Sequence, residues 1–126
     1  MIARMDAMEL LDDPSGVRVI ALQGEHDLAS AGALRLALAG AREAKRPVVI
    51  ELSVVSFIDS TILGVIVGGL RECKDDGRGF AVVASSDESE SVPRLLGVAG
   101  LRAVFPVYES RAQAIEQAST GRNSPV

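Results

Sequence analysis

The sequence predicts a single α/β domain, built on a mixed β-sheet with an N-terminal hairpin and about four α-helices. The chain has 126 residues, the length of one ordinary domain. Short apolar runs alternate with segments whose apolar residues recur every three or four positions, the pattern of strands followed by helices. Only 3% of the residues are aromatic, so the core must consist of Leu, Val, Ile and Ala, which suits packed α/β layers.

An antiparallel hairpin is expected at the start of the chain. Residues 7–11 and 17–23 are apolar runs, separated by a polar break that contains Pro14 and Gly16, residues typical of turns. Apolar residues occupy both faces of the second run, so we expect that strand to be mostly buried. An amphipathic helix follows over 29–41, because its apolar residues fall at i, i+3, i+4 and i+7.

The rest of the chain alternates strands with helices. We expect strands over 48–52, 80–84 and 104–107, and helices over 60–76, 91–99 and 110–118. The last helix opens with a capping box, Ser-Arg-Ala-Gln. Successive right-handed βα units would form a mixed sheet, and we expect sheet and helices to make a single pair of layers. Residues 1–119 are the predicted domain, and residues 120–126 are a polar tail that we expect to be flexible.

Composition excludes several functional classes. Thirteen basic and seventeen acidic residues give a net charge of −4, so the chain lacks the basic stripe that binds nucleic-acid phosphates. The single cysteine, Cys73, excludes an internal disulfide, and we expect it to be a small buried hydrophobe. Apolar stretches are too short to span a bilayer, and the first residues do not form a signal peptide. We therefore expect a soluble cytoplasmic protein with neither a nucleic-acid nor a membrane partner.

Enzyme motifs are also missing. The sequence has no phosphate-binding P-loop and no nucleophile elbow, and its only histidine, His26, cannot form a multi-histidine metal site. A lone histidine in a predicted loop is more often a surface residue than a base, even beside Asp27. We expect no catalysis, no metal and no cofactor. A phosphoaspartate receiver with Asp59 as acceptor is a weak alternative, because no lysine lies near the last predicted strand.

A polar pair stands at the start of the second predicted helix. Either Asp59 or Ser60 can cap the first amides of this helix, and capping is the explanation that the sequence alone favours. Alternatively, the Ser60 hydroxyl is exposed where the helix dipole tolerates an added phosphoryl group. Phosphorylation would add about −1.5 to −2 charges beside Asp59 and would repel a partner that fits the neutral serine.

Three segments resemble the hallmark regions of STAS domains. They are residues 22–28 (LQGEHDL), residues 57–64 (FIDSTILG) and residues 96–114, which end in SRAQA. The resemblance covers about residues 7–118, and the order and spacing of the motifs are most similar to those of bacterial anti-sigma factor antagonists. It implies a STAS-like fold, which agrees with the order of elements derived above.

The resemblance implies a regulatory binding protein. Antagonists of this family bind an anti-sigma factor that is also an ATP-dependent serine kinase, and this binding frees a sigma factor for transcription. Phosphorylation of a serine at a helix start breaks the complex, and a phosphatase restores it. By position, Ser60 matches the phosphoacceptor, and we expect Asp27, Asp59, Thr61 and Leu63 at the partner surface. The chain would be the substrate of the kinase and not itself an enzyme.

One position departs from the family pattern. The family usually has glycine two residues after the acceptor serine, where this chain has Ile62. A β-branched residue adds bulk there and would hinder the close approach of a kinase's nucleotide. Two other functions stay open: a STAS adaptor subunit of a transport or stress-signalling assembly, and nucleotide binding by the domain itself, for which no phosphate loop is visible.

Overall fold

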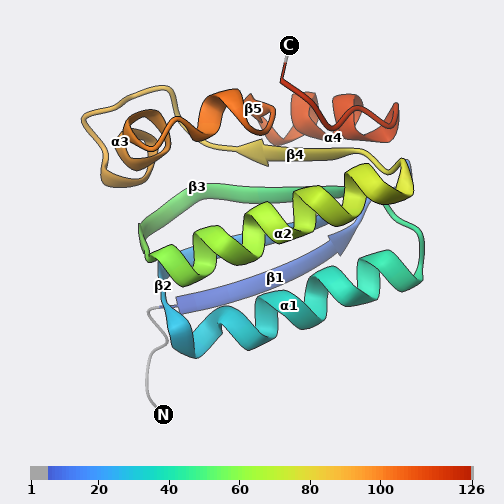
Figure 1. The fold of residues 1–126 in the computed structure, drawn as a ribbon, viewed down its shortest axis with the longest axis horizontal. Coiled ribbons are helices and arrows are strands. Elements are labelled where there is room, and N and C mark those ends of the chain that lie inside the picture. The colour runs from blue at the N-terminus through green and yellow to red at the C-terminus, as the bar shows by residue number, and fades with distance from the viewer. Residues whose placement is uncertain (1–5, 126) are drawn as a thin grey trace.

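Five strands form one mixed sheet in the order β1-β2-β3-β4-β5, in a computed structural model that describes residues 6–125. The strands are β1 (Asp6–Asp12), β2 (Arg18–His26), β3 (Val48–Ile58), β4 (Phe80–Val83) and β5 (Val107–Tyr108). The helices are α1 (Leu28–Glu43), α2 (Ser60–Asp76), α3 (Ser91–Val98) and α4 (Arg111–Ser119), with a short 3-10 helix at Leu101–Ala103. β1 is antiparallel to β2, and every other neighbouring pair is parallel. The predicted fold class is confirmed (Figure 1).

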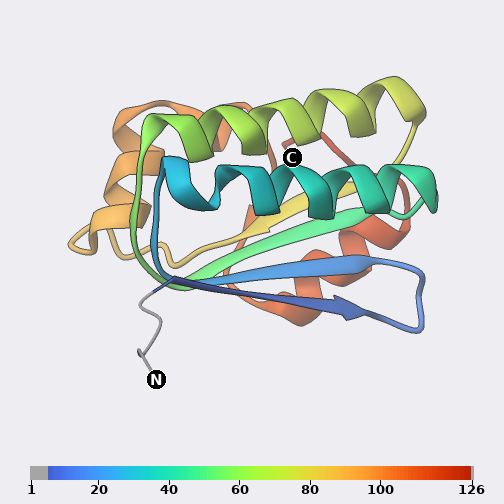
Figure 2. The same cartoon turned by 90° about the horizontal axis from the view of Figure 1, so that it is seen from below.

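Helices cover both faces of the sheet, so the expected single pair of layers is wrong. Figure 2 shows α1 and α2 side by side on one face and α4 across the sheet from them. All four residues of β4 are buried: Val82 faces the larger core beneath α1, α2 and α3, whereas Ala81 and Val83 face the smaller core beneath α4. The sequence of such a strand is apolar at every position, because both of its faces are covered.

Three strands differ by three or more residues from their expected bounds: β2, which runs on to His26, β3 and β5. β3 continues beyond residue 52 to Ile58, because Val55 and Ile58 still enter the core although the residues between them are exposed. The expected strand over 104–107 begins only at Val107, after a 3-10 turn. Phe105 of that apolar run fills the core and is fully buried instead of pairing in the sheet.

The chain after α4 runs back to the start of β4. The Phe80 N–H donates to the Arg122 carbonyl oxygen at 2.9 Å, and the Asn123 amide donates to the Arg78 carbonyl oxygen at 2.9 Å. Gly79 permits the close approach, because a Cβ there would collide with the backbone of Ala118. The flexibility expected of residues 120–126 stays a prediction.

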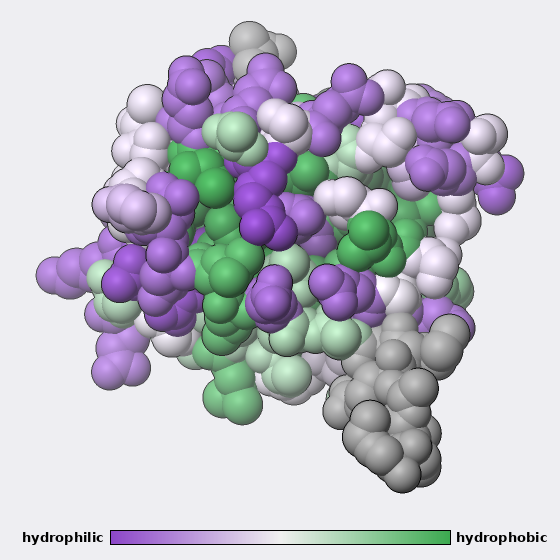
Figure 3. Space-filling model, turned by 180° about the vertical axis from the view of Figure 1, so that it is seen from behind, coloured by the Kyte–Doolittle hydropathy of each residue, from purple (hydrophilic) through white to green (hydrophobic). Residues whose placement is uncertain are grey.

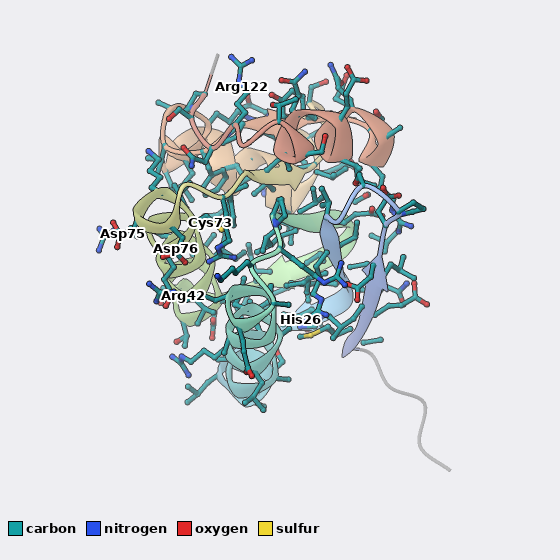
Figure 4. All side chains as sticks on the ribbon, turned by 90° about the vertical axis from the view of Figure 1, so that its right-hand side faces the viewer. His26, Arg42, Cys73, Asp75, Asp76 and Arg122 are labelled. Atoms are coloured by element: carbon teal, nitrogen blue, oxygen red, sulfur yellow. The ribbon has the colours of Figure 1, made fainter. Side chains whose placement is uncertain are left out.

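His26 is buried at the end of β2, with only 2% of its surface exposed, so its expected surface position is wrong. Its Nε2 lies 3.0 Å from the Gln23 carbonyl oxygen and 3.2 Å from that of Ala7. Both are acceptors, so Nε2 carries a proton. Its Nδ1 lies 3.0 Å from Ser30 Oγ. The imidazole thus joins β1, β2 and α1, and Figure 4 marks its place in the fold.

We expect His26→Leu to lower the free energy of unfolding by about 1–3 kcal/mol, because leucine fills the space but offers no hydrogen bond to the buried polar groups. Urea denaturation measures this loss. Ser30→Ala leaves both contacts of Nε2 in place but removes the hydroxyl that meets Nδ1 and donates to the Asp27 carbonyl oxygen, and it should cost about 1 kcal/mol. A His26→Leu protein as stable as the wild type would contradict this role of the imidazole.

Cys73 is buried on the core side of α2, as predicted, and 1% of its surface is exposed. Burial raises the pKa of the thiol to about 11, so the reactive thiolate is scarce at pH 8. We expect the native protein to resist Ellman's reagent at pH 8 and the guanidinium-unfolded protein to react with one equivalent. Rapid reaction of the folded protein would show that the thiol is accessible.

Candidate functional site

Asp59 caps α2 and leaves the Ser60 hydroxyl unused. Asp59 Oδ1 accepts from the Ile62 N–H at 3.0 Å, as an N-cap side chain does. Ser60 is the first residue of the helix; its side chain is exposed and has no hydrogen-bond partner among residues 6–125. Of the two caps that the sequence allowed, the structure selects Asp59. Capping therefore does not explain the serine at position 60.

Ile62 does not stand in the way of Ser60. Its side chain is fully buried in the core, so the hindrance expected from its bulk is absent from the surface around the serine. Thr61 is partly exposed. Leu63 is also partly exposed and packs against the core, so only part of its side chain is open to a partner.

Asp27 occupies the equivalent position in front of α1. Its Oδ1 accepts from the Ala29 N–H at 2.9 Å, and its side chain is exposed. His26 pairs with Ile58 in the parallel ladder of β2 and β3, so the next residue of each strand, Asp27 or Asp59, lies at the same edge of the sheet. The His26 carbonyl oxygen also accepts from the Asp59 N–H at 3.2 Å. The structure therefore brings Asp27, Asp59 and Ser60 together, at the edge where open α/β sheets bind their ligands.

The sequence did not predict that large apolar side chains are exposed near these residues. Leu28 is 70% exposed, Phe57 48% and Val98 81%. Phe57 and Val98 line a groove of about 380 Å³ between the end of β3 and α3, together with Leu95. Exposed aromatic side chains are frequent anchors of protein interfaces. The available signal was Phe57 itself, one of four aromatic residues and three positions before Ser60.

A second groove, of about 650 Å³, begins at Ser60 and Thr61 and runs between α1 and α2. It is lined by side chains from both helices, including Arg35 and Arg71, and by glycines of α2. Neither arginine forms a salt bridge within the described part of the chain.

Charge is distributed unevenly along α1 and α2. At their C-terminal ends Arg42 contacts Glu72 at 2.8 Å and Asp76 at 2.9 Å, and Figure 4 shows Arg42 and Asp76 on neighbouring helices. The hydrogen bond from Arg42 holds the pKa of the Asp76 carboxyl below its usual value. At the N-terminal ends neither Asp27 nor Asp59 forms a salt bridge with residues 6–125. A negative group added at Ser60 would join two carboxylates without a neutralising ion pair.

Residues 6–125 contain no group of three or more His, Cys, Asp or Glu side chains placed to hold a metal ion. Within the same residues, none of the helices combines the length and the apolar character needed to cross a bilayer.

The two roles of Asp59, cap and charge, can be separated by substitution. We expect Asp59→Ala to lower the free energy of unfolding by about 1 kcal/mol, because the Ile62 N–H loses its acceptor. Asp59→Asn keeps a capping oxygen, removes the charge and should stay within about 0.5 kcal/mol of the wild type. Urea unfolding of both variants checks this, and equal losses would mean that the charge, and not the cap, stabilises α2.

Comparisons with known proteins identify the family and agree with the fold. Residues 10–114 match the family model of the STAS domain. The anti-sigma F factor antagonist of Paenibacillus polymyxa is 30% identical over 104 residues, which are 81% of this chain and 86% of that protein. The crystal structure of an anti-sigma factor antagonist from Mycobacterium paratuberculosis superimposes with a TM-score of 0.75 and 28% identity, covering 90% of this chain and 93% of that one. Unphosphorylated SpoIIAA, at 20% identity, shares the fold with a TM-score of 0.69 over 87% of this chain and 96% of its own. The chain belongs to the STAS domain family.

Proposed function

We propose that this chain is an anti-sigma factor antagonist: it binds an anti-sigma factor, frees a sigma factor and is switched off when the anti-sigma factor, acting as a serine kinase, phosphorylates Ser60. The observation that carries the proposal is the exposed hydroxyl of Ser60 at the start of a helix that Asp59 already caps. The relatives named as anti-sigma factor antagonists support the class of partner.

The surface around Ser60 suits a protein partner. Leu28 follows Asp27 in the chain, Phe57 precedes Asp59 by two residues, and both apolar side chains are exposed. Apolar anchors with a polar rim are the usual composition of a protein interface. In this proposal the partner buries Leu28 and Phe57 and offers hydrogen-bond donors to the two carboxylates.

Phosphorylation at Ser60 would change this surface without unfolding the domain. The Ser60 oxygen attacks the γ-phosphorus of ATP bound to the kinase, a new O–P bond forms, ADP leaves, and the hydroxyl proton passes to a base of the kinase. The product adds about −1.5 to −2 charges. The positive end of the α2 dipole favours this charge locally, whereas a partner already matched to two carboxylates meets excess negative charge. A phosphatase that removes the phosphoryl group restores binding.

Substitutions of Ser60 test the switch. We expect Ser60→Ala to bind the purified anti-sigma factor as the wild type does and to keep binding after incubation with Mg-ATP. Ser60→Asp should weaken binding at least about tenfold, because it places a permanent charge at the same point. Ser124→Asp, a like change in the C-terminal segment, is the control and should bind normally. Calorimetric titration with each anti-sigma kinase of the same organism measures these affinities.

The outcomes separate the alternatives. If the Ser60→Ala variant is still fully phosphorylated, Ser60 is not the phosphoacceptor. Binding of a transporter or scaffold component that is indifferent to residue 60 would place the chain among STAS adaptors and leave Ser60 without a switching role.

Substitutions of Asp27 test the partner surface apart from the fold. Asp27→Ala loses the cap of α1 as well as the carboxylate, so we expect weaker binding together with about 1 kcal/mol of lost stability. Asp27→Asn retains a capping oxygen, and we expect it to weaken binding with little change in thermal unfolding. An Asp27→Asn variant that binds the anti-sigma factor like the wild type would assign Asp27 a structural role only.

A further inference from the structure

α1 is apolar on its solvent side as well as on its core side. Leu36 is 76% exposed and Leu28 70%, and between residues 28 and 41 the only charged side chain is that of Arg35. A surface helix ordinarily carries charged and polar residues on its outer side. Exposed apolar surface of this kind on a helix is typical of a binding interface.

The neighbouring side of α2 is also uncharged. Residues 60–70 contain no charged residue. Gly64 and Gly68 line the groove between the helices, and a Cβ built on either glycine meets nothing within 4 Å. Glycine in a helix interior costs about 1 kcal/mol relative to alanine. Within residues 6–125 no close packing offsets that cost at either position, whereas a partner's backbone could approach these two positions closely.

This face of α1 and α2, on which Arg35 is the one charged residue within 28–41 and 60–70, is bounded by charged groups. Asp27 and Asp59 stand at its N-terminal end, and the salt bridges of Arg42 stand at its C-terminal end. The face behind, shown in Figure 3, differs: its hydrophobic side chains are interrupted by polar ones. The ion pair of Arg111 with Glu51 belongs to the α4 side of the sheet.

We propose that the face formed by Leu28, Leu36, Arg35, Gly64 and Gly68 is a second docking surface, which receives an apolar helix carrying a carboxylate from the anti-sigma factor. The inference rests on the proposed function and extends its interface. Continuity supports it, because Ser60 and Thr61 line the same groove as Arg35 and the two glycines. A helix that enters at Ser60 would follow the groove between α1 and α2.

Charge selects this occupant over a second copy of the chain. Arg35, Arg71 and Glu72 are the charged side chains that line the groove, and Glu72 is already paired with Arg42. Neither arginine forms a salt bridge with residues 6–125, so an acidic residue of a partner can pair with them. In a symmetric dimer the same surface meets itself, and two arginine-lined grooves would face each other. A helix from a different protein that is apolar and carries an acidic residue can pack against the leucines and pair with the arginines.

Filling the groove is the direct test. Gly68→Leu places a side chain in open space and improves helix propensity, so the domain should stay folded while the groove is blocked. We expect Gly68→Leu and Leu36→Arg each to weaken binding of the purified anti-sigma factor at least tenfold. The affinity of Gly68→Ala should lie between those of Gly68→Leu and the wild type. Ala112→Arg on the exposed side of α4 is the control and should bind normally. Thermal unfolding confirms that each variant is folded.

The results distinguish this proposal from the proposed function. Normal binding by Gly68→Leu and Leu36→Arg, with Ser60→Asp still impaired, would overturn the second surface and leave the proposed function standing. A wild-type chain that binds no anti-sigma factor would overturn both. A wild-type dimer that Leu36→Arg converts to a monomer in sedimentation would assign the face to a second copy and overturn the proposal. Weakening by both variants of a monomeric protein, with Ala112→Arg unaffected, supports it.

Discussion

The hydrogen bonds around His26 hold in place the end of the domain that carries Asp27, Asp59 and Ser60. Its ring reaches the carbonyl oxygens of Ala7 and Gln23 and the hydroxyl of Ser30, and its own carbonyl oxygen accepts from the Asp59 N–H. One buried residue therefore contacts β1, β2, the first turn of α1 and the loop before α2. Buried polar groups need such partners, and meeting that need here fixes the relative positions of two helix starts.

At this end of the domain, Asp27 and Asp59 cap the helices, and Ser60 has no capping role. Asp27 and Asp59 each satisfy a backbone amide of the helix that follows, so neither helix start depends on Ser60. The aspartates provide both capping hydrogen bonds. A modification of the Ser60 hydroxyl would therefore break neither of them. A group added to Ser60 in the proposed switch would change the surface and leave both caps in place.

The sequence predicted the elements best where local signals agree. α2 has a capping residue, a regular apolar period and Gly77 in the left-handed conformation at its end, and both of its bounds were predicted. His26 was misplaced because one of its acceptors, Ala7, lies 19 residues away, a contact that no local pattern contains. The exposure of Phe57 likewise depends on how α3 packs beside β3.

The side of the sheet taken by α4 escaped prediction for a topological reason. Each of β2, β3 and β4 lies beside the next strand along the chain, so right-handed crossovers place α1, α2 and α3 on the same face. α4 follows β5 without a returning strand, so the handedness rule does not restrict it. It covers the other face through its small residues Ala114 and Ala118.

That arrangement divides the interior into two cores separated by the sheet. The core beneath α4 contains Val17, Val19 and Ala81 and shares no buried side chain with the core that supports α2. A substitution on the α4 side therefore repacks against residues that do not touch the core that supports α2. A repacked side chain beneath α4 would therefore be separated from Asp59 and Ser60 by the full thickness of the sheet.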